Sequence, residues 1–168
     1  MGGNGAIWGN FPTTNLMSTS SNSKPIFSGE FRHALDGKSR VTIPSAWRSG
    51  EADEFFLMPG QNDTCVRAMP PDEYRAVAER AKASPGVDAE ELSIFLRHFY
   101  SRAHRVTTDK QGRLVLPEEF CKNAALTGEI MLVGVLDHFE IWSRETWDAT
   151  KENEKATFRR VSKLAGLL

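Results

Sequence analysis

The sequence predicts a mainly β fold with packed helices, an α+β chain built from two copies of one unit. The first observation is an internal repeat: Leu35–Pro44 (LDGKSRVTIP) returns as Thr108–Pro117 (TDKQGRLVLP), each Asp, Arg and Pro reappearing 73 residues later. The second is the short β-branched and alternating segments around both blocks, which are typical of strands. The third is the amphipathic segments that follow them at helical spacing. A repeat of this kind indicates two copies of one supersecondary unit, which we expect to share a core.

In the first copy, alternation predicts a strand over 26–35, with Phe31 and His33 on one face. Residues 36–39 form a tight turn because Asp and Gly both favour reversals. A β-branched strand follows at 41–43, and Pro44 suits the first turn of a short helix containing Trp47. The remaining predicted elements of this copy are strands over 54–58 and 65–69 and a helix over 71–83.

Residues 84–86 (SPG) interrupt the helical pattern, and Asp88 with Glu91 forms a capping-box signature for a further helix. The second copy begins near Arg102 and repeats the same order of elements. Ser143 is the predicted cap of a C-terminal helix starting at about Arg144. The end of that helix has an apolar face that must meet the core or a partner, made of Phe158, Val161, Leu164, Ala165 and Leu168.

These patterns divide the chain into four segments. Residues 1–25 are a polar extension rich in Gly, Asn, Ser and Thr, with no periodicity, which we expect to be disordered. Residues 26–83 form the first repeat with its helix, 84–101 a connecting helix, and 102–168 the second repeat with a C-terminal helix. Both repeats together are predicted to make one double-unit domain.

Composition restricts the possible functions. The chain has 168 residues and a net charge of −1, so nucleic acid is not attracted by the overall charge. A local basic stretch between Arg97 and Arg113 holds five Arg or Lys residues and one acid, Asp109, although a solvated face has the same composition. Cys65 and Cys121 form neither a disulfide framework nor a zinc motif. With no secretory signal or apolar membrane span in the sequence, we expect a cytoplasmic protein.

The repeated turns are the candidate site. Asp36 and Arg40, like Asp109 and Arg113, are four residues apart across a tight reversal. In one interpretation the Asp caps turn N–H groups and the Arg pairs with it. In the other the Arg guanidinium is free to bind phosphates or guanine edges bidentately.

The turns contain further candidate residues beside the Asp–Arg pairs. Lys38 and Lys110 would add phosphate contacts, which position a protein on DNA without specifying sequence. Gly37 and Gly112 are expected to help shape the turns, together with Asp36 and Asp109.

An enzyme is the competing class of function. The four histidines and many carboxylates form no His-Glu-x-x-His motif, phosphate-binding glycine loop or Gly-x-Ser-x-Gly elbow. We therefore expect no catalytic residue, no metal site, no cofactor and no small-molecule substrate. The aromatic residues at equivalent places in both copies are predicted to be core residues rather than base-stacking platforms: Trp47, Phe120, Tyr74 and Trp147.

Four segments together resemble the MraZ family: Phe27–Phe31 (FSGEF), Leu35–Pro44, Asp109–Pro117 (DKQGRLVLP) and Val133–Trp142 (VGVLDHFEIW). The resemblance extends from about Phe27 to the C-terminus. Either Asp-x-x-x-Arg turn alone is a weak signal, but the two turns with their following prolines are specific. The resemblance implies two tandem AbrB/SpoVT-like swapped-hairpin β-barrel repeats and a ring-shaped homo-oligomer of eight or more subunits.

The resemblance also implies a function. MraZ-like proteins are bacterial transcriptional regulators, usually repressors of the division and cell-wall gene cluster that includes their own promoter. They bind short direct repeats in double-stranded DNA through the Asp-x-x-x-Arg turns. Carried over to this chain, the candidate DNA-binding residues are Arg40, which we place first, and Lys38, Lys110 and Arg113. A cytoplasmic, nucleoid-associated protein is expected.

Two features depart from the family pattern. The family usually has Gly before the turn Arg, and this chain keeps Gly112 but has Ser39 in the first turn. If that position requires a positive φ, Ser39 is strained where glycine would not be. The other departure is the extension to about Pro25. The alternative function is a ring-forming structural or protein-interaction module that does not bind specific DNA.

Overall fold

The computed structural model describes residues 24–50 and 52–168, so the predicted extension 1–25 lies outside the described residues except for its last two. The first copy contains β1 (Glu30–Ala34), β2 (Arg40–Thr42), the 3-10 helix η1 (Ser45–Trp47), β3 (Glu54–Pro59), the 3-10 helix η2 (Gln61–Asp63), β4 (Val66–Met69) and α1 (Pro71–Ala83). Helix α2 (Ala89–Ser101) follows it. The second copy contains β5 (His104–Thr107), β6 (Arg113–Val115), α3 (Glu118–Asn123), β7 (Glu129–Val135), β8 (His138–Ser143) and α4 (Arg144–Leu164).

The strands of the two copies interleave. A six-stranded sheet has the order β1-β7-β8-β4-β3-β5, and β2 pairs with β6 in a separate two-stranded ribbon. Thus β1 of the first copy pairs with β7 of the second, while β5 of the second pairs with β3 of the first. Between these edge strands, β4 and β8 join the copies at the centre of the sheet. All of these pairings are antiparallel, and together with the helices they confirm the predicted α+β class.

The first strand is shorter than the predicted 26–35. It begins at Glu30, because Gly29 has a φ of +96° that interrupts the extended backbone. Phe27 still reaches the sheet through an isolated bridge to Leu136. Within β1 the predicted alternation holds, since Phe31 and His33 are half-buried and their neighbours are exposed.

One hydrophobic core serves both copies, and equivalent residues occupy equivalent places in it. Trp47 and Phe120 are each 5% exposed, as the repeat predicts for core residues. Leu57 of β3 and Leu132 of β7 are both fully buried. The rings of Phe27, Trp47, Phe55 and Phe139 meet at centroid distances of 5.1–6.2 Å. Because strands from both copies line this core, neither half encloses it alone.

The helices begin where the sequence predicts. Helix α2 has the predicted capping box: the Asp88 side chain accepts from the Glu91 N–H at 2.8 Å, and the Glu91 side chain accepts from the Asp88 N–H at 3.0 Å. The Ser143 hydroxyl accepts from the Thr146 N–H at 3.1 Å at the start of α4. These caps satisfy backbone donors that a helix start otherwise leaves unpaired.

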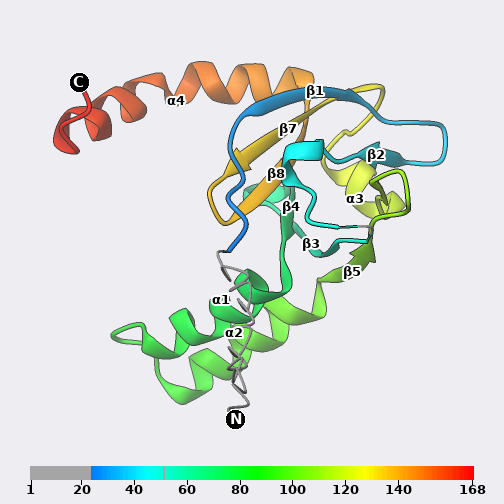
Figure 1. The fold of residues 1–168 in the computed structure, drawn as a ribbon. Helices are drawn as coiled ribbons and strands as arrows, with labels where there is room; N and C mark the ends of the chain where they lie inside the picture. Colours follow the sequence, from blue (N-terminus) through cyan, green and yellow to red (C-terminus); the bar gives the residue numbers. More distant parts are fainter. Residues whose placement is uncertain (1–23, 51) are drawn as a thin grey trace, which may run out of the picture.

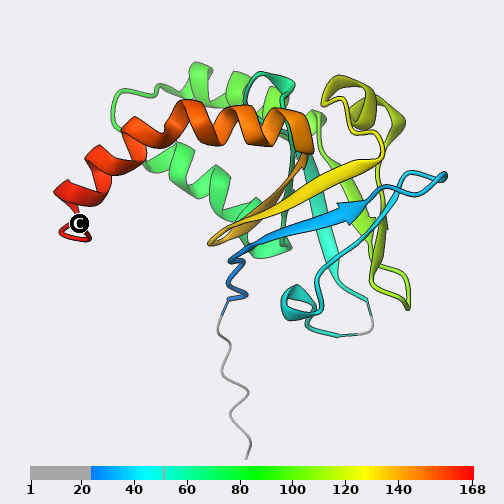
Figure 2. The same ribbon diagram turned by 90° about the horizontal axis from the view of Figure 1, so that it is seen from above.

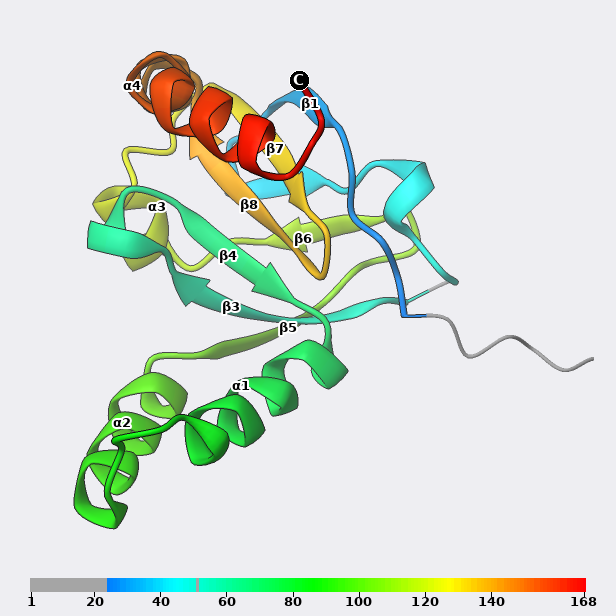
Figure 3. The same ribbon diagram turned by 90° about the vertical axis from the view of Figure 1, so that its left-hand side faces the viewer.

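Helices α1, α2 and α4 extend to one side of the molecule, and the charged turns lie on the other side together with α3 (Figure 1). In Figure 1, the turn between β1 and β2 and the turn between β5 and β6 are at the right, while α4 runs to the upper left and α1 and α2 to the lower left. The view from above in Figure 2 keeps the same separation. Figure 3 shows α4 beside β7 and β8, and the α1–α2 hairpin on the opposite side, beneath β3 and β5. The turns are therefore not covered by α1, α2 or α4 (Figure 1).

Candidate nucleic-acid interface

The first turn is organised by the carboxylate of Asp36. Its Oδ1 accepts the backbone N–H groups of Lys38 and Arg40, each at 2.9 Å, and its Oδ2 accepts Arg40 Nε at 2.7 Å. The Ser39 N–H donates to the Asp36 carbonyl at 3.0 Å. The hydrogen bond from the Arg40 backbone is the main cause that lowers the pKa of Asp36 to about 2, so the carboxylate stays charged.

The second turn repeats this arrangement. The Oδ1 of Asp109 accepts the N–H groups of Gln111 and Arg113, each at 2.9 Å, and its Oδ2 accepts Arg113 Nε at 2.7 Å. The Gly112 N–H donates to the Asp109 carbonyl at 2.9 Å. The pKa of Asp109 is lowered, again chiefly by the backbone N–H of its arginine. The repeat therefore preserves atomic contacts as well as residue identities.

These contacts combine the two interpretations that the sequence left open. Each Asp caps its turn and each Arg pairs with it, but the pairing uses only Nε. Within residues 24–50 and 52–168, no hydrogen bond engages the terminal nitrogens of Arg40 or Arg113. About a quarter to a third of each arginine side chain is exposed, 27% for Arg40 and 30% for Arg113. A guanidinium held through Nε can still present its two Nη groups to an acceptor.

The two turns lie at opposite ends of the β2–β6 ribbon. Val41 pairs with Leu114 at its centre, and both side chains are buried in the shared core. Because side chains alternate along a strand, the flanking residues face outward. Those residues are Arg40, Thr42, Arg113 and Val115. Val115 is 57% exposed, so this face is open.

Backbone hydrogen bonds between the copies fix the turns to each other. The Leu116 N–H donates to the Ser39 carbonyl, and the Ile43 N–H donates to the Gly112 carbonyl, both at 2.8 Å. Ile43 and Leu116 are themselves buried. Each turn is thus held by backbone of the other copy, and the two turns are joined through one ribbon.

The position before each turn arginine does require a positive φ. Ser39 has φ +56° and Gly112 has φ +75°. An L-residue in this left-handed region is destabilised by roughly 1–2 kcal/mol, whereas glycine adopts it readily. Ser39 is therefore strained, although its turn keeps the same hydrogen bonds as the glycine-containing one.

The other predicted site residues are the turn lysines and Gly37. Lys38 and Lys110 are exposed near the tips of their turns, where a phosphate can reach them. Gly37 is also exposed in its turn. A Cβ on this residue would meet no atom within 4 Å, so the space around it does not require a glycine.

The basic stretch from Arg97 to Arg113 is less of a patch than its sequence suggests. Arg102 pairs with Asp63 at 2.9 Å, and Arg105 donates from Nε to Glu54 at 2.8 Å. These acids come from the first copy, so the neutralisation is not visible in the local sequence. The other basic residues of this stretch are Arg97, exposed on α2, and Lys110 and Arg113 at the second turn.

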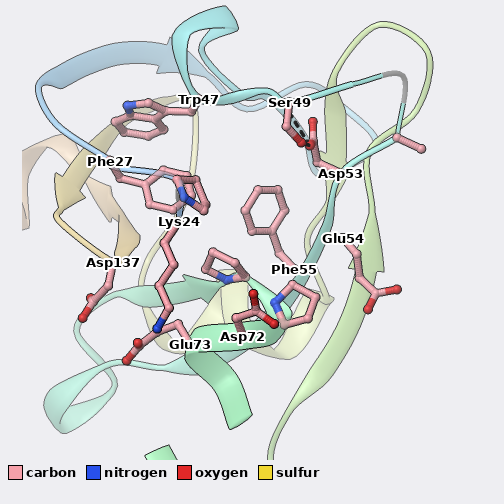
Figure 4. Close-up of a pocket in the computed structure, with 14 residues that line it drawn as sticks. Lys24, Phe27, Trp47, Ser49, Asp53, Glu54, Phe55, Asp72, Glu73 and Asp137 are labelled. Carbon is pink, nitrogen blue, oxygen red and sulfur yellow. Dashed lines mark hydrogen bonds between the residues drawn. The ribbon is translucent and has the colours of Figure 1, made fainter. Parts of the chain in front are cut away.

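A separate pocket of about 310 Å³ lies away from the turns. Figure 4 shows the rings of Phe27 and Trp47 on one side and the carboxylates of Asp72, Glu73 and Asp137 on the other. This acidic lining has the wrong charge for a phosphate backbone, and it includes no histidine.

Two further searches concern metals and membranes. Across the described part of the chain, no group of three or more His, Cys, Asp or Glu residues is arranged to hold a metal ion. None of the helices described here combines the length and apolar character needed to cross a bilayer.

Comparison with known proteins gives a consistent family. A family model described as "MraZ protein, putative antitoxin-like" matches residues 99–165. A protein of Natranaerobius thermophilus named "Transcriptional regulator MraZ" is 35% identical over 82% of this chain and 94% of its own length. This chain belongs to the MraZ family. Relatives of the same name in Desulforamulus reducens and Clostridium tetani are 36% and 37% identical, over 82% and 73% of this chain and 95% and 85% of their own lengths. The family predicted from the turns is thus confirmed.

Proposed function

We propose that this chain is a sequence-specific DNA-binding transcriptional regulator that represses the division and cell-wall gene cluster including its own promoter. Membership of the MraZ family and the names of its relatives support a role in transcription regulation. The observation that carries the DNA-binding part is the pair of matched Asp-x-x-x-Arg turns at the two ends of one ribbon. In the cell, such a protein acts in the cytoplasm at the nucleoid.

The turns suit a contact with double-stranded DNA. The Nη groups of Arg40 and Arg113 are available to phosphates or to guanine edges, which arginine binds bidentately. Lys38 and Lys110 add phosphate contacts that set the position of the protein. The outward face of the ribbon between the turns is narrow, and a two-stranded β-ribbon is an element that the major groove admits. The interleaved strands support the AbrB/SpoVT-like swapped-hairpin assignment of the two repeats.

A ring of eight or more subunits would present the pair of turns many times, whereas one subunit presents it once. Two exposed apolar surfaces lie at different places on the subunit. One is the end of α4, with Phe158, Val161, Leu164, Leu167 and Leu168; the other is the α1–α2 hairpin, with Val87, Ile94 and Phe95. Helix α2 has no buried residue in the single chain. Contacts between two different surfaces are heterologous and close into rings.

The ring explains why the operator should contain direct repeats. One site offers few contacts and binds weakly. Once one repeat is bound, the next engagement is intramolecular and avidity rises by about 10²–10⁴. We expect weak binding to one repeat, a steep rise with two or three, and a salt slope of about −0.9 for each phosphate neutralised. Equal affinity for one and three repeats would contradict this mechanism.

The decisive experiment is fluorescence anisotropy with the full-length protein and the duplex from upstream of its own gene. Scrambled DNA of the same composition is the control duplex. Arg40→Ala and Arg113→Ala should reduce specific binding while the proteins stay folded and assembled. Arg75→Ala is the matched control, because this arginine is 78% exposed and belongs to α1, the helix that Figure 1 shows on the side of the molecule away from the turns. Similar binding of native and scrambled DNA would favour the alternative, a structural or protein-interaction module.

The ring is tested separately by native mass spectrometry. Leu164→Asp on α4 and Phe95→Asp on α2 each place a charge on one of the two apolar surfaces. Both variants should yield smaller species while the far-UV circular dichroism is unchanged. If both variants assemble as the wild type does, these surfaces are not the subunit contacts.

A further inference from the structure

Two pairs of residues occupy equivalent positions behind the two turns. The repeat spacing of 73 residues relates Ser39 to Gly112 and relates Arg48 to Cys121. Arg48 directly follows η1 of the first copy and contacts Gly112, whereas Cys121 lies within α3 of the second copy and contacts Ser39. The two turns therefore have the same hydrogen bonds but different side chains behind them.

Behind the second turn, Arg48 takes the space that a side chain at position 112 would need. A Cβ on Gly112 would lie 2.3 Å from Arg48 Nη1 and 2.6 Å from its Cδ, which no real contact allows. Arg48 Nη1 donates to the Gln111 carbonyl at 3.4 Å. Gly112 is buried beneath this side chain. The glycine thus serves both the positive φ and the approach of Arg48.

Behind the first turn the combination is different. Ser39 has a Cβ, so an arginine at position 121 would meet it as Arg48 would meet a side chain on residue 112. The residue there is Cys121, which is shorter and uncharged. Burial raises the pKa of this thiol, the neighbouring Ser39 side chain lowers it in part, and Glu118 raises it further. The residue equivalent to Arg48 behind the first turn is therefore an uncharged cysteine.

The charges at the two turns therefore differ. The second turn combines Arg113, Lys110 and Arg48 with the single acid Asp109. The first combines only Arg40 and Lys38 with its acid. A phosphate backbone responds to local positive charge, and a preorganised turn loses less conformational freedom on binding.

We propose that Arg48 is a positioning residue for the second turn and makes it the dominant DNA contact of each subunit, ahead of the first turn. Arg48 acts through Gly112 and Gln111, fixing the turn and adding a positive charge at its base. The first turn has Ser39 and Cys121 at the equivalent positions, so it lacks both the glycine and the charged side chain that support the second turn. This inference rests on the proposed DNA-binding function.

The first test compares the two arginines on the upstream duplex by fluorescence anisotropy. Arg113→Ala should weaken binding about tenfold more than Arg40→Ala, because it removes the arginine of the turn with the higher charge. Equal losses, or a larger loss for Arg40→Ala, would overturn the proposal. If the wild type does not distinguish native from scrambled DNA, the proposed function itself fails, and this inference fails with it.

The second test removes the Arg48 side chain from behind the second turn. Arg48→Ala should weaken binding and make the salt slope shallower by about 0.9 for each engaged turn, while Arg48→Lys should restore the slope. A residue with a purely structural role would change affinity without changing the slope. An unchanged slope in a folded Arg48→Ala protein therefore overturns the charge contribution.

The third test places the glycine and arginine of the second turn at the equivalent positions of the first turn. It keeps the proposal testable even if Arg48→Ala fails to fold. The double variant Ser39→Gly/Cys121→Arg should increase affinity and steepen the salt slope, because both residues of the second-turn pair are then present in the first turn. Cys121→Arg alone should give no such gain, since the Ser39 side chain occupies the space. If the single variant equals the double one, residues 39 and 121 are not coupled and the proposal is wrong.

Discussion

The first and second turns share their hydrogen bonds but differ in what lies behind them. In both, one Asp carboxylate accepts two backbone N–H groups and an arginine Nε at nearly identical distances. Behind them, the first turn has a strained Ser39, whereas the second has Gly112 beneath Arg48. The comparison teaches that a repeat can keep the hydrogen-bond geometry of a turn constant while the supporting side chains diverge. Substitutions at equivalent positions therefore show which properties belong to the repeat and which to one copy.

The largest effects are expected where the copies are alike. Leu57→Ala and Leu132→Ala remove equivalent, fully buried side chains, and each should lower the free energy of unfolding by about 2–5 kcal/mol. Urea denaturation followed by circular dichroism at a fixed protein concentration measures both. Because the core is shared, each variant should unfold in one transition. Two separate transitions would show that the halves are independent.

A smaller loss of stability is expected at a sheet position where the two copies differ. In the β3 and β7 segments the two copies are offset by 75 residues instead of 73, so Gly134 of β7 corresponds to Pro59 of β3, and the N-terminal backbone crosses closely at Gly134. A Cβ there would lie 2.6 Å from Phe27 C and Ser28 N, so Gly134→Ala should destabilise the protein by about 1–3 kcal/mol. Pro59→Ala is the matched control, with an expected loss below about 1 kcal/mol. Equal losses in thermal denaturation would mean that the crossing does not constrain β7.

Exchanging the residues that precede the two turn arginines should change the stability by unequal amounts. Gly112→Ser places a side chain at positive φ and displaces Arg48, so we expect a loss of about 1–2 kcal/mol or more. Ser39→Gly relieves the same strain but increases the freedom of the unfolded chain, so stability should change by less than about 1 kcal/mol. Differential scanning calorimetry of both variants checks this. A neutral Gly112→Ser would rule out a close Gly112–Arg48 contact.

The smallest expected effect is a change in stability at low pH. Folding lowers the pKa of Asp36 to about 2, so its charged form stabilises the turn above the ordinary Asp pKa. That contribution should be complete above about pH 4 and disappear as the pH falls from about 4 to 2. Thermal denaturation of the wild type and of Asp36→Asn across pH 2–7 measures it. The difference between the two proteins should shrink in acid; a constant difference would show that ionisation of this carboxylate is not involved.

Local features of the fold were predictable because local chemistry determines them. Asp88 and Glu91 identified the start of α2, and Ser143 the start of α4. The turns were found because Asp, Arg and the following Pro recur at one spacing. The sequence also raised the question of a positive φ at position 39, because the family usually has glycine there, and the structure shows that φ is positive.

Features that depend on distant partners were not predictable from the residues. Periodicity identifies β1 and β5 as strands but does not show that each pairs with a strand of the other copy. Arg102 and Arg105 read as part of a basic patch because Asp63 and Glu54 lie far away in the sequence. The contact of Arg48 with Gly112 gave no signal at all, because it joins a residue of one copy to a turn of the other.

The interleaved sheet has a consequence for biosynthesis. When β1 leaves the ribosome, its only partner in the described sheet, β7, has not been made, since Glu30 pairs with Val133. At about 5–20 residues per second, translation reaches that partner roughly 5–20 s later. During that interval the first repeat is an incomplete sheet with apolar residues such as Phe55 and Leu57 uncovered. The nascent chain therefore depends on protection from aggregation until its second half emerges, although each repeat looks like a unit able to fold by itself.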